Sequence, residues 1–171
     1  FPYLEDFEQD SGAWFAMGLN NSWEWGSPAS STINTAASGQ KSWKTALAGH
    51  YNDNEYSYLY SPCFNLQGMA NPTMSFAMAY DLEDCRQFNV FCDGAWLEYS
   101  TDGISWQKLG TASNGTNWYD NSNEQAWTLR NQTHWHVATT PLPKINGNIR
   151  IRLVMASDDF TVREGVAIDD I

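Results

Sequence analysis

Alternation of apolar and polar residues with a period of two is the feature that most restricts the fold of this chain. In "TMSFAMAY" and in "NIRIRLVMAS" every second residue is large and apolar. These residues are Met74, Phe76, Met78 and Tyr80 in the first stretch, and Ile149, Ile151, Leu153 and Met155 in the second. Successive side chains of a strand point to opposite faces, so both stretches are predicted to be strands with one buried face. No stretch shows an apolar stripe at helical spacing over ten residues.

Shorter strand candidates surround these two stretches. "SYLYSPCFNL", "AWLEYS", "SWQKL" and "HWHVATT" are rich in aromatic and β-branched residues, and Asp102-Gly103 in "EYSTDGISW" is a hairpin signal. The segments between the candidates, such as "SPASSTINTAASGQ" and "TASNGTNWYDNSNEQ", are typical of loops. Many short strands joined by polar loops predict an all-β fold, an antiparallel sandwich of two sheets.

Length and charge limit the classes of function. The 171 residues show no linker and no internal repeat, so residues 1–171 are predicted to form a single domain. The net charge is −11 and the few basic residues do not cluster, which argues against a nucleic-acid partner. No apolar run is long enough for membrane insertion. The acid-rich, lysine-poor composition is compatible with secretion.

Aromatic residues are unusually frequent, with 9 Trp, 8 Tyr and 8 Phe making up 15% of the chain. Several stand among Asn, Asp and Gln in "NNSWEWGSP" and "GTNWYDNSNEQAW". A flat apolar ring beside polar groups is what recognition of a sugar requires. We therefore predict ligand contact at Trp118 and Tyr119, with Trp23 as a further candidate, on an exposed rim of polar loops. The alternative is that these rings fill the core.

The three cysteines cannot all be paired within one chain. Cys85 and Cys92 bracket the short loop "CRQFNVFC", which a disulfide could close in an oxidising compartment. Cys63 stands among apolar residues and is predicted to be a free, buried thiol. No spacing of Cys and His indicates a zinc site.

Catalytic motifs are not apparent. The acids of "YDLEDC" form one run rather than a demonstrated pair across a cleft, which glycoside hydrolysis would need. No GxSxG occurs, and no motif ties a serine or cysteine to a histidine. Enzymatic function is therefore not expected.

The two ends of the chain place acids inside apolar stretches, "FPYLEDFEQD" and "VREGVAIDDI". Because neighbouring side chains of a strand face opposite ways, either Asp169 or Asp170 should lie beside the core face. A buried carboxylate needs a cation or hydrogen-bond donors beside it, since burying it unpaired costs on the order of several kcal/mol. The alternative is that both are surface acids of an edge strand.

Five motifs in order resemble a known family: "LEDFE", "SWEWGSP", "SYLYSPCFNL", "DGAWLEYSTDGISWQKLG" and "EGVAIDDI". The chain resembles MAM-like jelly-roll modules, and more closely the immune-inhibitor-A-like and cleaved-adhesin modules of large secreted proteins of Bacteroidetes-type bacteria. The resemblance implies a jelly-roll β-sandwich that serves as an accessory module of proteases, glycosidases or adhesins. It also implies a bacterial secreted or cell-surface location.

Related modules carry a structural Ca²⁺ where the first and last strands lie side by side. Matched to this chain, the resemblance implies that Glu8 and Asp169 are metal ligands, together with loop carbonyls; calcium takes six to eight oxygen ligands. The chain departs from the family at "DLEDCRQFNVFCDGAW", which we interpret as an insertion closed by the disulfide.

Two functional hypotheses stay open. The first is a calcium-stabilised, non-catalytic binding module for a polysaccharide or a glycoprotein glycan. It requires aromatic rings exposed together on a loop rim or a sheet face. The second is a structural or adhesin-type accessory domain that contacts other domains of a larger secreted chain. It requires nearly all tryptophans to be buried.

Overall fold

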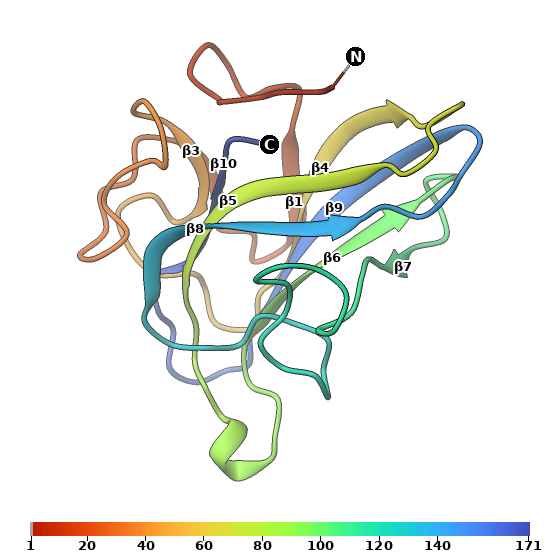
Figure 1. The fold of residues 1–171 in the computed structure, drawn as a ribbon. Coiled ribbons are helices and arrows are strands. Elements are labelled where there is room, and N and C mark those ends of the chain that lie inside the picture. Colours follow the sequence, from red (N-terminus) through yellow and green to blue (C-terminus); the bar gives the residue numbers. More distant parts are fainter. Residues whose placement is uncertain (1) are drawn as a thin grey trace.

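The computed structural model describes residues 2–171, which form two antiparallel sheets packed face to face (Figure 1). The strands are β1 (Phe15–Leu19), β2 (Trp23–Gly26), β3 (Ser42–Thr45), β4 (Tyr56–Asn65), β5 (Thr73–Asp81), β6 (Gly94–Ser100), β7 (Gln107–Lys108), β8 (Gln132–Pro141), β9 (Asn148–Ala156) and β10 (Gly165–Asp169). One short 3₁₀ helix, η1 (Arg86–Phe88), lies between β5 and β6. The chain is an all-β, two-sheet jelly-roll sandwich; the alternating pattern predicts the two sheets, and the family resemblance implies the jelly roll.

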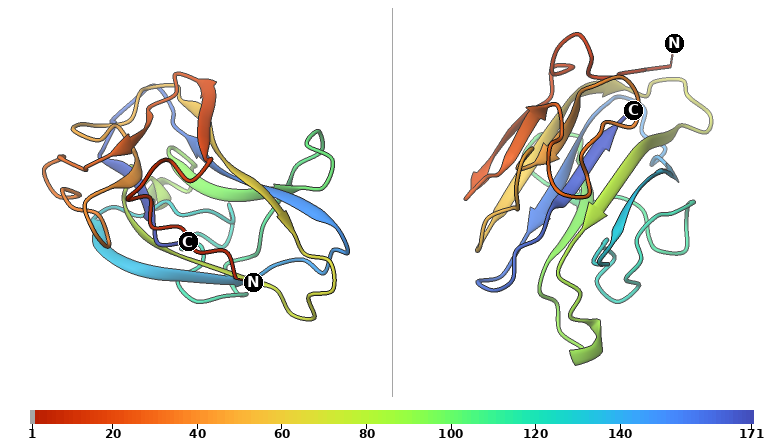
Figure 2. Two further views of the ribbon diagram at one scale, coloured as in Figure 1. Left: turned by 90° about the horizontal axis from the view of Figure 1, so that it is seen from above. Right: turned by 90° about the vertical axis from the view of Figure 1, so that its left-hand side faces the viewer.

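Each sheet contains five strands. Sheet A has the order β1-β4-β9-β6-β7, and sheet B has the order β2-β3-β10-β5-β8. Neighbours in a sheet are mostly distant in the sequence, so the chain crosses repeatedly between the sheets (Figure 2). Residues 2–171 contain no helix long and apolar enough to span a bilayer.

The two longest alternating stretches are strands, as predicted. In β5, Met74, Phe76 and Met78 are all buried. In β9, Ile149, Ile151, Leu153 and Met155 are also buried, whereas the intervening arginines point to the opposite face. The Asp102-Gly103 hairpin joins β6 to β7, where Glu98 pairs with Lys108. The Asp102 carboxylate closes this turn by accepting hydrogen bonds from the backbone N–H groups of Ile104 and Ser105, both 2.8 Å long.

The two chain ends lie side by side. Glu5 and Ile171 exchange two backbone hydrogen bonds, each 2.9 Å long, just beyond the end of β10. The segment before β1 therefore lies next to the end of β10. The first strand itself, β1, belongs to the other sheet, so the chain ends lie side by side but the first and last strands do not.

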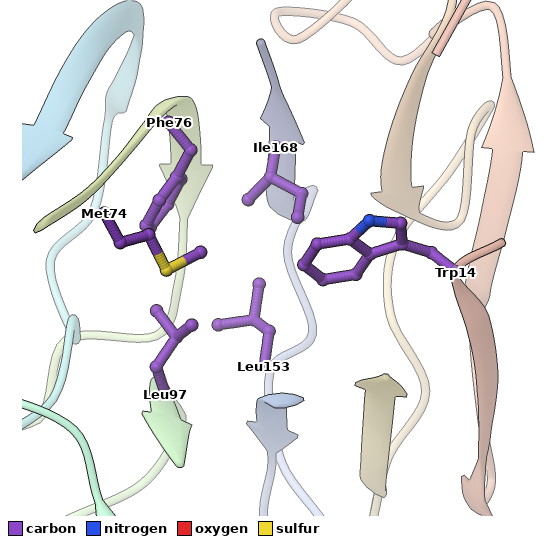
Figure 3. A pocket seen from close by; sticks show the side chains of 6 residues that line it. All are labelled: Trp14, Met74, Phe76, Leu97, Leu153 and Ile168. Atoms are coloured by element: carbon purple, nitrogen blue, oxygen red, sulfur yellow. The ribbon is translucent and has the colours of Figure 1, made fainter. Parts of the chain in front are cut away.

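The core fills the space between the sheets with apolar side chains. Figure 3 shows a small gap in it, lined by six residues from both sheets and the segment before β1: Trp14, Met74, Phe76, Leu97, Leu153 and Ile168. Every one of these side chains is buried. The gap is a packing feature of the interior, and it offers no polar group that could orient a ligand.

Candidate functional site

The outward face of sheet A carries an array of aromatic rings around one arginine. Leu59, Leu97 and Leu153 point into the core, so the residues that alternate with them point outward. The strand register aligns five outward residues in one row across the sheet: Phe15, Tyr60, Arg152, Glu98 and Lys108. The next row contains Met17, Tyr58, Val154 and Trp96. We call this surface, together with Leu19, Tyr56 and Trp106, the aromatic face.

The rings of this face contact one another in series. Phe15 stacks on Tyr60 with ring centroids 5.2 Å apart and planes 13° from parallel. Tyr60 in turn meets Trp106 edge to face at 5.5 Å and Tyr58 at 5.7 Å. Separations of this size are those of favourable aromatic pairs, worth about 1 kcal/mol each. The contacts fix the ring orientations relative to one another.

Arg152 lies at the centre of the aromatic face. Its guanidinium carbon is 4.0 Å from the centroid of Tyr58 and 4.1 Å from that of Trp106, so the cation is held between two rings. Its Nε and Nη2 atoms donate to Oε2 of Glu98 at 2.7 and 2.6 Å. Oε1 of Glu98 accepts a hydrogen bond from the indole of Trp96, 2.9 Å long. Both carboxylate oxygens of Glu98 are thus engaged, and they hold Arg152 and Trp96 in place on the face.

Part of the aromatic face is open to solvent. Phe15 is 42% exposed, Tyr56 43%, Met17 54% and Leu19 62%. Tyr58, Tyr60 and Trp106 are half-buried, with their remaining surface on the same side. A contiguous exposed patch of large apolar side chains is uncommon on an isolated domain and marks an interaction site. The arrangement can offer flat ring surfaces flanked by fixed charged groups.

The predicted exposure of the aromatic rings on the loop rim is wrong. Trp118 is 3% exposed and Tyr119 is 5% exposed, and both pack in the core against the fully buried Trp127. The indole of Trp118 and the hydroxyl of Tyr119 both donate to the Leu109 carbonyl, at 3.1 and 2.7 Å. The loop places both rings in the core, because removing large apolar rings from water lowers the free energy of the folded state. They have no free face for a sugar.

Trp23 is also buried. It begins β2, where its neighbour on β3 is Thr45, and its side chain is 5% exposed. Six of the nine tryptophans are buried in this way, and the half-buried ones are Trp25, Trp106 and Trp135. Most tryptophans therefore stabilise the sandwich, and Trp106 is the tryptophan that contributes partly exposed ring surface to the aromatic face.

The cysteines pair as predicted, but the free thiol lies elsewhere than expected. A disulfide joins Cys85 to Cys92 and closes the loop that contains η1. Cys63 is free and exposed, not buried. A register shift between Tyr60 and Cys63 interrupts the pairing of β4 with β9 and turns the Cys63 side chain outward.

Asp169 is fully buried, and its charge is compensated by backbone donors. Its Oδ2 atom accepts hydrogen bonds from the N–H groups of Ala37 and Ser38, at 2.9 and 3.2 Å, and its Oδ1 atom accepts one from Asp170. Burial raises the pKa of this carboxyl to about 6 despite the three donors. The neighbouring Asp170 lies just beyond the end of β10 and is exposed.

Glu8 binds the same loop as Asp169. Its Oε1 atom accepts hydrogen bonds from the N–H groups of Gln40 and Lys41, at 2.8 and 2.6 Å. One lone pair of Asp169 Oδ1 and the Oε2 atom of Glu8 remain without a described donor, so both residues keep capacity to bind a cation. The two carboxylates thus fasten the loop of residues 37–41 to both chain ends.

The aromatic face was missed by reasoning from the sequence. Its signal is the series of alternating tyrosines in "YSYLYS", Tyr56, Tyr58 and Tyr60, of which Tyr60 lies opposite Arg152 of β9. Because the core residue Leu59 lies between them, those tyrosines had to point away from the core.

Comparison with solved structures shows which known domains share this fold. TmCBM61, solved in complex with β-1,4-galactotriose, matches 97% of this chain and 91% of its own with a TM-score of 0.56 and 13% identity. The K1 cleaved adhesin domain of Lys-gingipain from Porphyromonas gingivalis W83 matches 98% of this chain and 94% of its own, with a TM-score of 0.54 and 13% identity. The fold is the β-sandwich of carbohydrate-binding modules and cleaved adhesin domains. No family model matches the sequence.

A curated relative is similar over nearly the whole chain. Bacillopeptidase F of Bacillus subtilis (strain 168) is 28% identical over 170 residues, which cover 99% of this chain and 10% of the relative. The chain therefore spans about a tenth of the length of that protein. The expected likeness to cleaved adhesin modules is confirmed at the level of the fold, and the finer assignment to MAM-like or immune-inhibitor-A-like modules stays a prediction.

Proposed function

We propose that this chain is a non-catalytic, extracellular module that binds a glycan through the aromatic face of sheet A. The observation that carries the proposal is the series of ordered rings around Arg152, which offers flat apolar surfaces beside fixed polar groups. A sugar ring stacks on such surfaces with its C–H groups and bonds to the polar groups with its hydroxyls. The fold, which TmCBM61 shares in its complex with β-1,4-galactotriose, supports the same conclusion.

The location and context follow from the same features. A disulfide in a loop indicates an oxidising compartment, which supports a bacterial secreted or cell-surface location. The partial coverage of Bacillopeptidase F supports a role as an accessory module within a longer chain. In that context, modest affinity at one face is sufficient, because repeated modules or a multivalent polysaccharide multiply it.

Retention of the protein on immobilised polysaccharides tests the proposed function. We expect slowed migration in native gels that contain a β-linked polysaccharide such as β-1,4-galactan or xylan. Trp106→Ala and Phe15→Ala should each weaken retention about five- to tenfold, since one stacked ring contributes about 1 kcal/mol. Trp135→Ala removes a half-buried tryptophan from sheet B, and Phe160→Ala removes an exposed phenylalanine from a loop. These two matched variants should leave retention unchanged.

The competing candidate is a purely structural or adhesin-type accessory domain whose aromatic face packs against another domain. The result that favours this candidate is equal migration of the wild type and all four variants in every polysaccharide gel. Equal loss in the sheet A variants and their matched controls would also contradict the proposed face.

We also propose a structural Ca²⁺ at the chain ends, held by Glu8 and Asp169 with carbonyls of the loop between them. When bound, the ion would neutralise the two carboxylates and lock the N-terminal segment to β10. Support comes from the convergence of both acids on residues 37–41 and from the acceptor capacity that each retains. Chelation should lower the melting temperature of the wild type, and Glu8→Gln or Asp169→Asn should reduce that response. A melting curve that is indifferent to chelator would contradict this site.

A further inference from the structure

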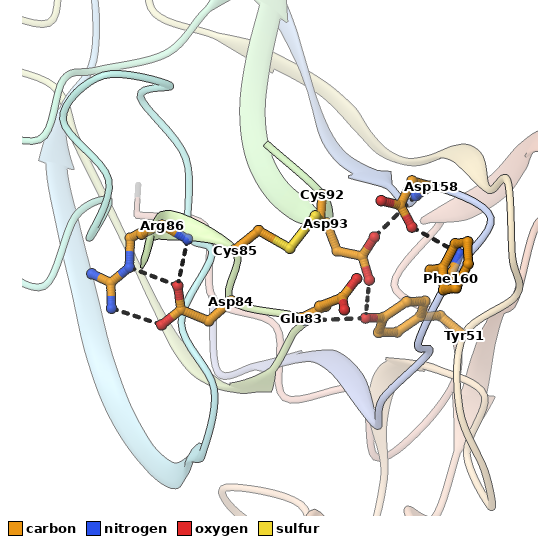
Figure 4. Close-up of a disulfide and its surroundings, with 9 residues drawn as sticks. All are labelled: Tyr51, Glu83, Asp84, Cys85, Arg86, Cys92, Asp93, Asp158 and Phe160. Atoms are coloured by element: carbon orange, nitrogen blue, oxygen red, sulfur yellow. Dashed lines mark hydrogen bonds and ion pairs between the residues drawn. A yellow bond between two sulfur atoms is a disulfide. The ribbon is translucent and has the colours of Figure 1, made fainter. Parts of the chain in front are cut away.

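Three acidic side chains meet at the end of the sandwich beside the disulfide (Figure 4). Glu83 follows β5, Asp93 directly follows Cys92, and Asp158 follows β9. One carboxylate oxygen from each residue lies within 4.8 Å of the other two. Two oxygens that bind one Ca²⁺ at 2.3–2.6 Å are at most about 5 Å apart, so the spacing admits a shared calcium ion.

Asp93 is the fixed centre of this cluster. It is 1% exposed, its Oδ2 atom accepts a hydrogen bond from the Tyr51 hydroxyl, and its Oδ1 atom accepts one from the Asp158 N–H at 3.0 Å. Each oxygen keeps one lone pair beyond these bonds. Burial raises the pKa of Asp93 to about 7, and its charged neighbours Asp158 and Glu83 are both acidic.

Glu83 supplies a separate observation. Its Oε2 atom is shielded from solvent, and residues 2–171 offer it no hydrogen-bond donor. Figure 4 shows the carboxylate of Glu83 beside Asp93 and the Tyr51 hydroxyl. A carboxylate oxygen without either water or a donor is costly, by about 1–3 kcal/mol or more for a charged group. A cation bound by this oxygen would remove that cost.

The surrounding chain holds the three acids in place. The disulfide closes the loop between Glu83 and Asp93, and the Glu83 N–H donates to the Tyr51 hydroxyl at 3.3 Å. The Phe160 N–H donates to Oδ1 of Asp158 at 2.8 Å. Cys85 and Cys92 also lie near Glu83, but disulfide sulfurs carry no thiolate, so the site has oxygen ligands only. Oxygen-only sites select hard cations.

We propose that Glu83, Asp93 and Asp158 bind a divalent cation of the calcium type, at a site separate from the chain ends. The ion joins the disulfide loop to the segment after β9 and so stabilises the end of the sandwich. Neither the proposed glycan binding nor the proposed ion at Glu8 and Asp169 is needed for this site.

Calorimetry with Ca²⁺ on chelator-treated protein tests the proposal. The measurement uses the Glu8→Gln background, which weakens any binding at the chain ends while Gln keeps the oxygen bonded by residues 40 and 41. Glu83→Gln and Asp158→Asn should each weaken binding at least tenfold. Asp84→Asn and Asp159→Asn change the charge equally at adjacent positions and should leave the affinity unchanged. At a free Ca²⁺ concentration a hundred times its dissociation constant, the melting temperature should rise by about 5–10 °C.

A second measurement needs no variant at the site. In ¹⁵N-labelled wild-type protein, titration with Ca²⁺ should shift the amide signals of Glu83, Asp93 and Asp158. The proposal is overturned if these signals do not move, if the background protein binds no Ca²⁺, or if Glu83→Gln and Asp158→Asn bind it as tightly as their controls do.

Discussion

Trp118→Ala should lower the free energy of unfolding of the protein and should have no direct effect on a ligand site. The side chain is 3% exposed and contacts the rings of Phe76, Tyr119 and Trp127 at centroid distances of 5.8, 5.5 and 5.2 Å. A buried tryptophan removes roughly 150–250 Å² from water, which at about 25 cal/mol per Å² gives about 4–6 kcal/mol as an upper bound. Losses measured for Trp→Ala in cores are about 3–5 kcal/mol.

Hydrogen bonding adds little to this loss. The Leu109 carbonyl, which accepts from the Trp118 indole, keeps its bond to the Tyr119 hydroxyl at 2.7 Å. No buried acceptor is left unsatisfied, so the expected loss stays at about 3–5 kcal/mol. For a domain of this size each kcal/mol lowers the melting temperature by about 2–4 °C, which predicts a drop of about 6–20 °C.

Urea unfolding and thermal melting, both followed by circular dichroism, measure this loss. Trp106→Ala is the matched variant, because it removes the same ring from the half-buried aromatic face and should cost only about 1–2 kcal/mol. A Trp118→Ala protein with unchanged stability but lost polysaccharide retention would refute the reasoning. It would restore the loop rim as the binding surface.

Three further expectations concern buried charges and thiols. The Lys44 ammonium is fully buried and donates to the carbonyls of Thr45, Ala46 and Glu164, and burial lowers its pKa to about 8. The unfolded chain then binds more protons between about pH 8 and 10.5, so this residue makes stability rise with pH by about 2–3 kcal/mol in that range. Urea unfolding at pH 7.5 and 9.5 should show the rise in wild type and not in Lys44→Met. Cys63 should react with iodoacetamide in the native protein, whereas modification of Cys85 or Cys92 without prior reduction would contradict the pairing. Glu164→Ala removes the carboxylate that accepts bonds from Thr32 and Ile33, so limited proteolysis should cut within residues 27–41 faster than in wild type; an unchanged cleavage rate would exclude this anchoring role.

Much of the fold could be predicted from local patterns. The long alternating stretches of β5 and β9 and the Asp-Gly turn carry enough signal by themselves, because burial of one face fixes both the period and the register. The short strands β1, β2 and β3 could not be recognised as readily. They owe their extended form to pairing with distant strands, since β1 pairs with β4 and β3 pairs with β10.

The candidate site was harder to predict, because exposure of an aromatic ring depends on tertiary packing. Trp118 and Tyr119 stand among Asn, Asp and Gly, yet the loop folds them inward against Trp127. Tyr58 and Tyr60 stand in an apolar strand, yet they point outward because Leu59 between them fills the core. Polar neighbours in the sequence were therefore a poor guide to exposure, and the alternation within β4 was a better one.

The location of the bound sugar tests the central claim most directly. Indole N–H signals of a ¹⁵N-labelled protein report each tryptophan separately during titration with an oligosaccharide of the polysaccharide that retains the protein. The signal of Trp106, on the aromatic face, should shift in a saturable manner, and those of the buried Trp118 and Trp127 should stay in place. Shifts confined to Trp118 and Trp127, or none for any oligosaccharide of a broad panel, would contradict glycan binding at sheet A.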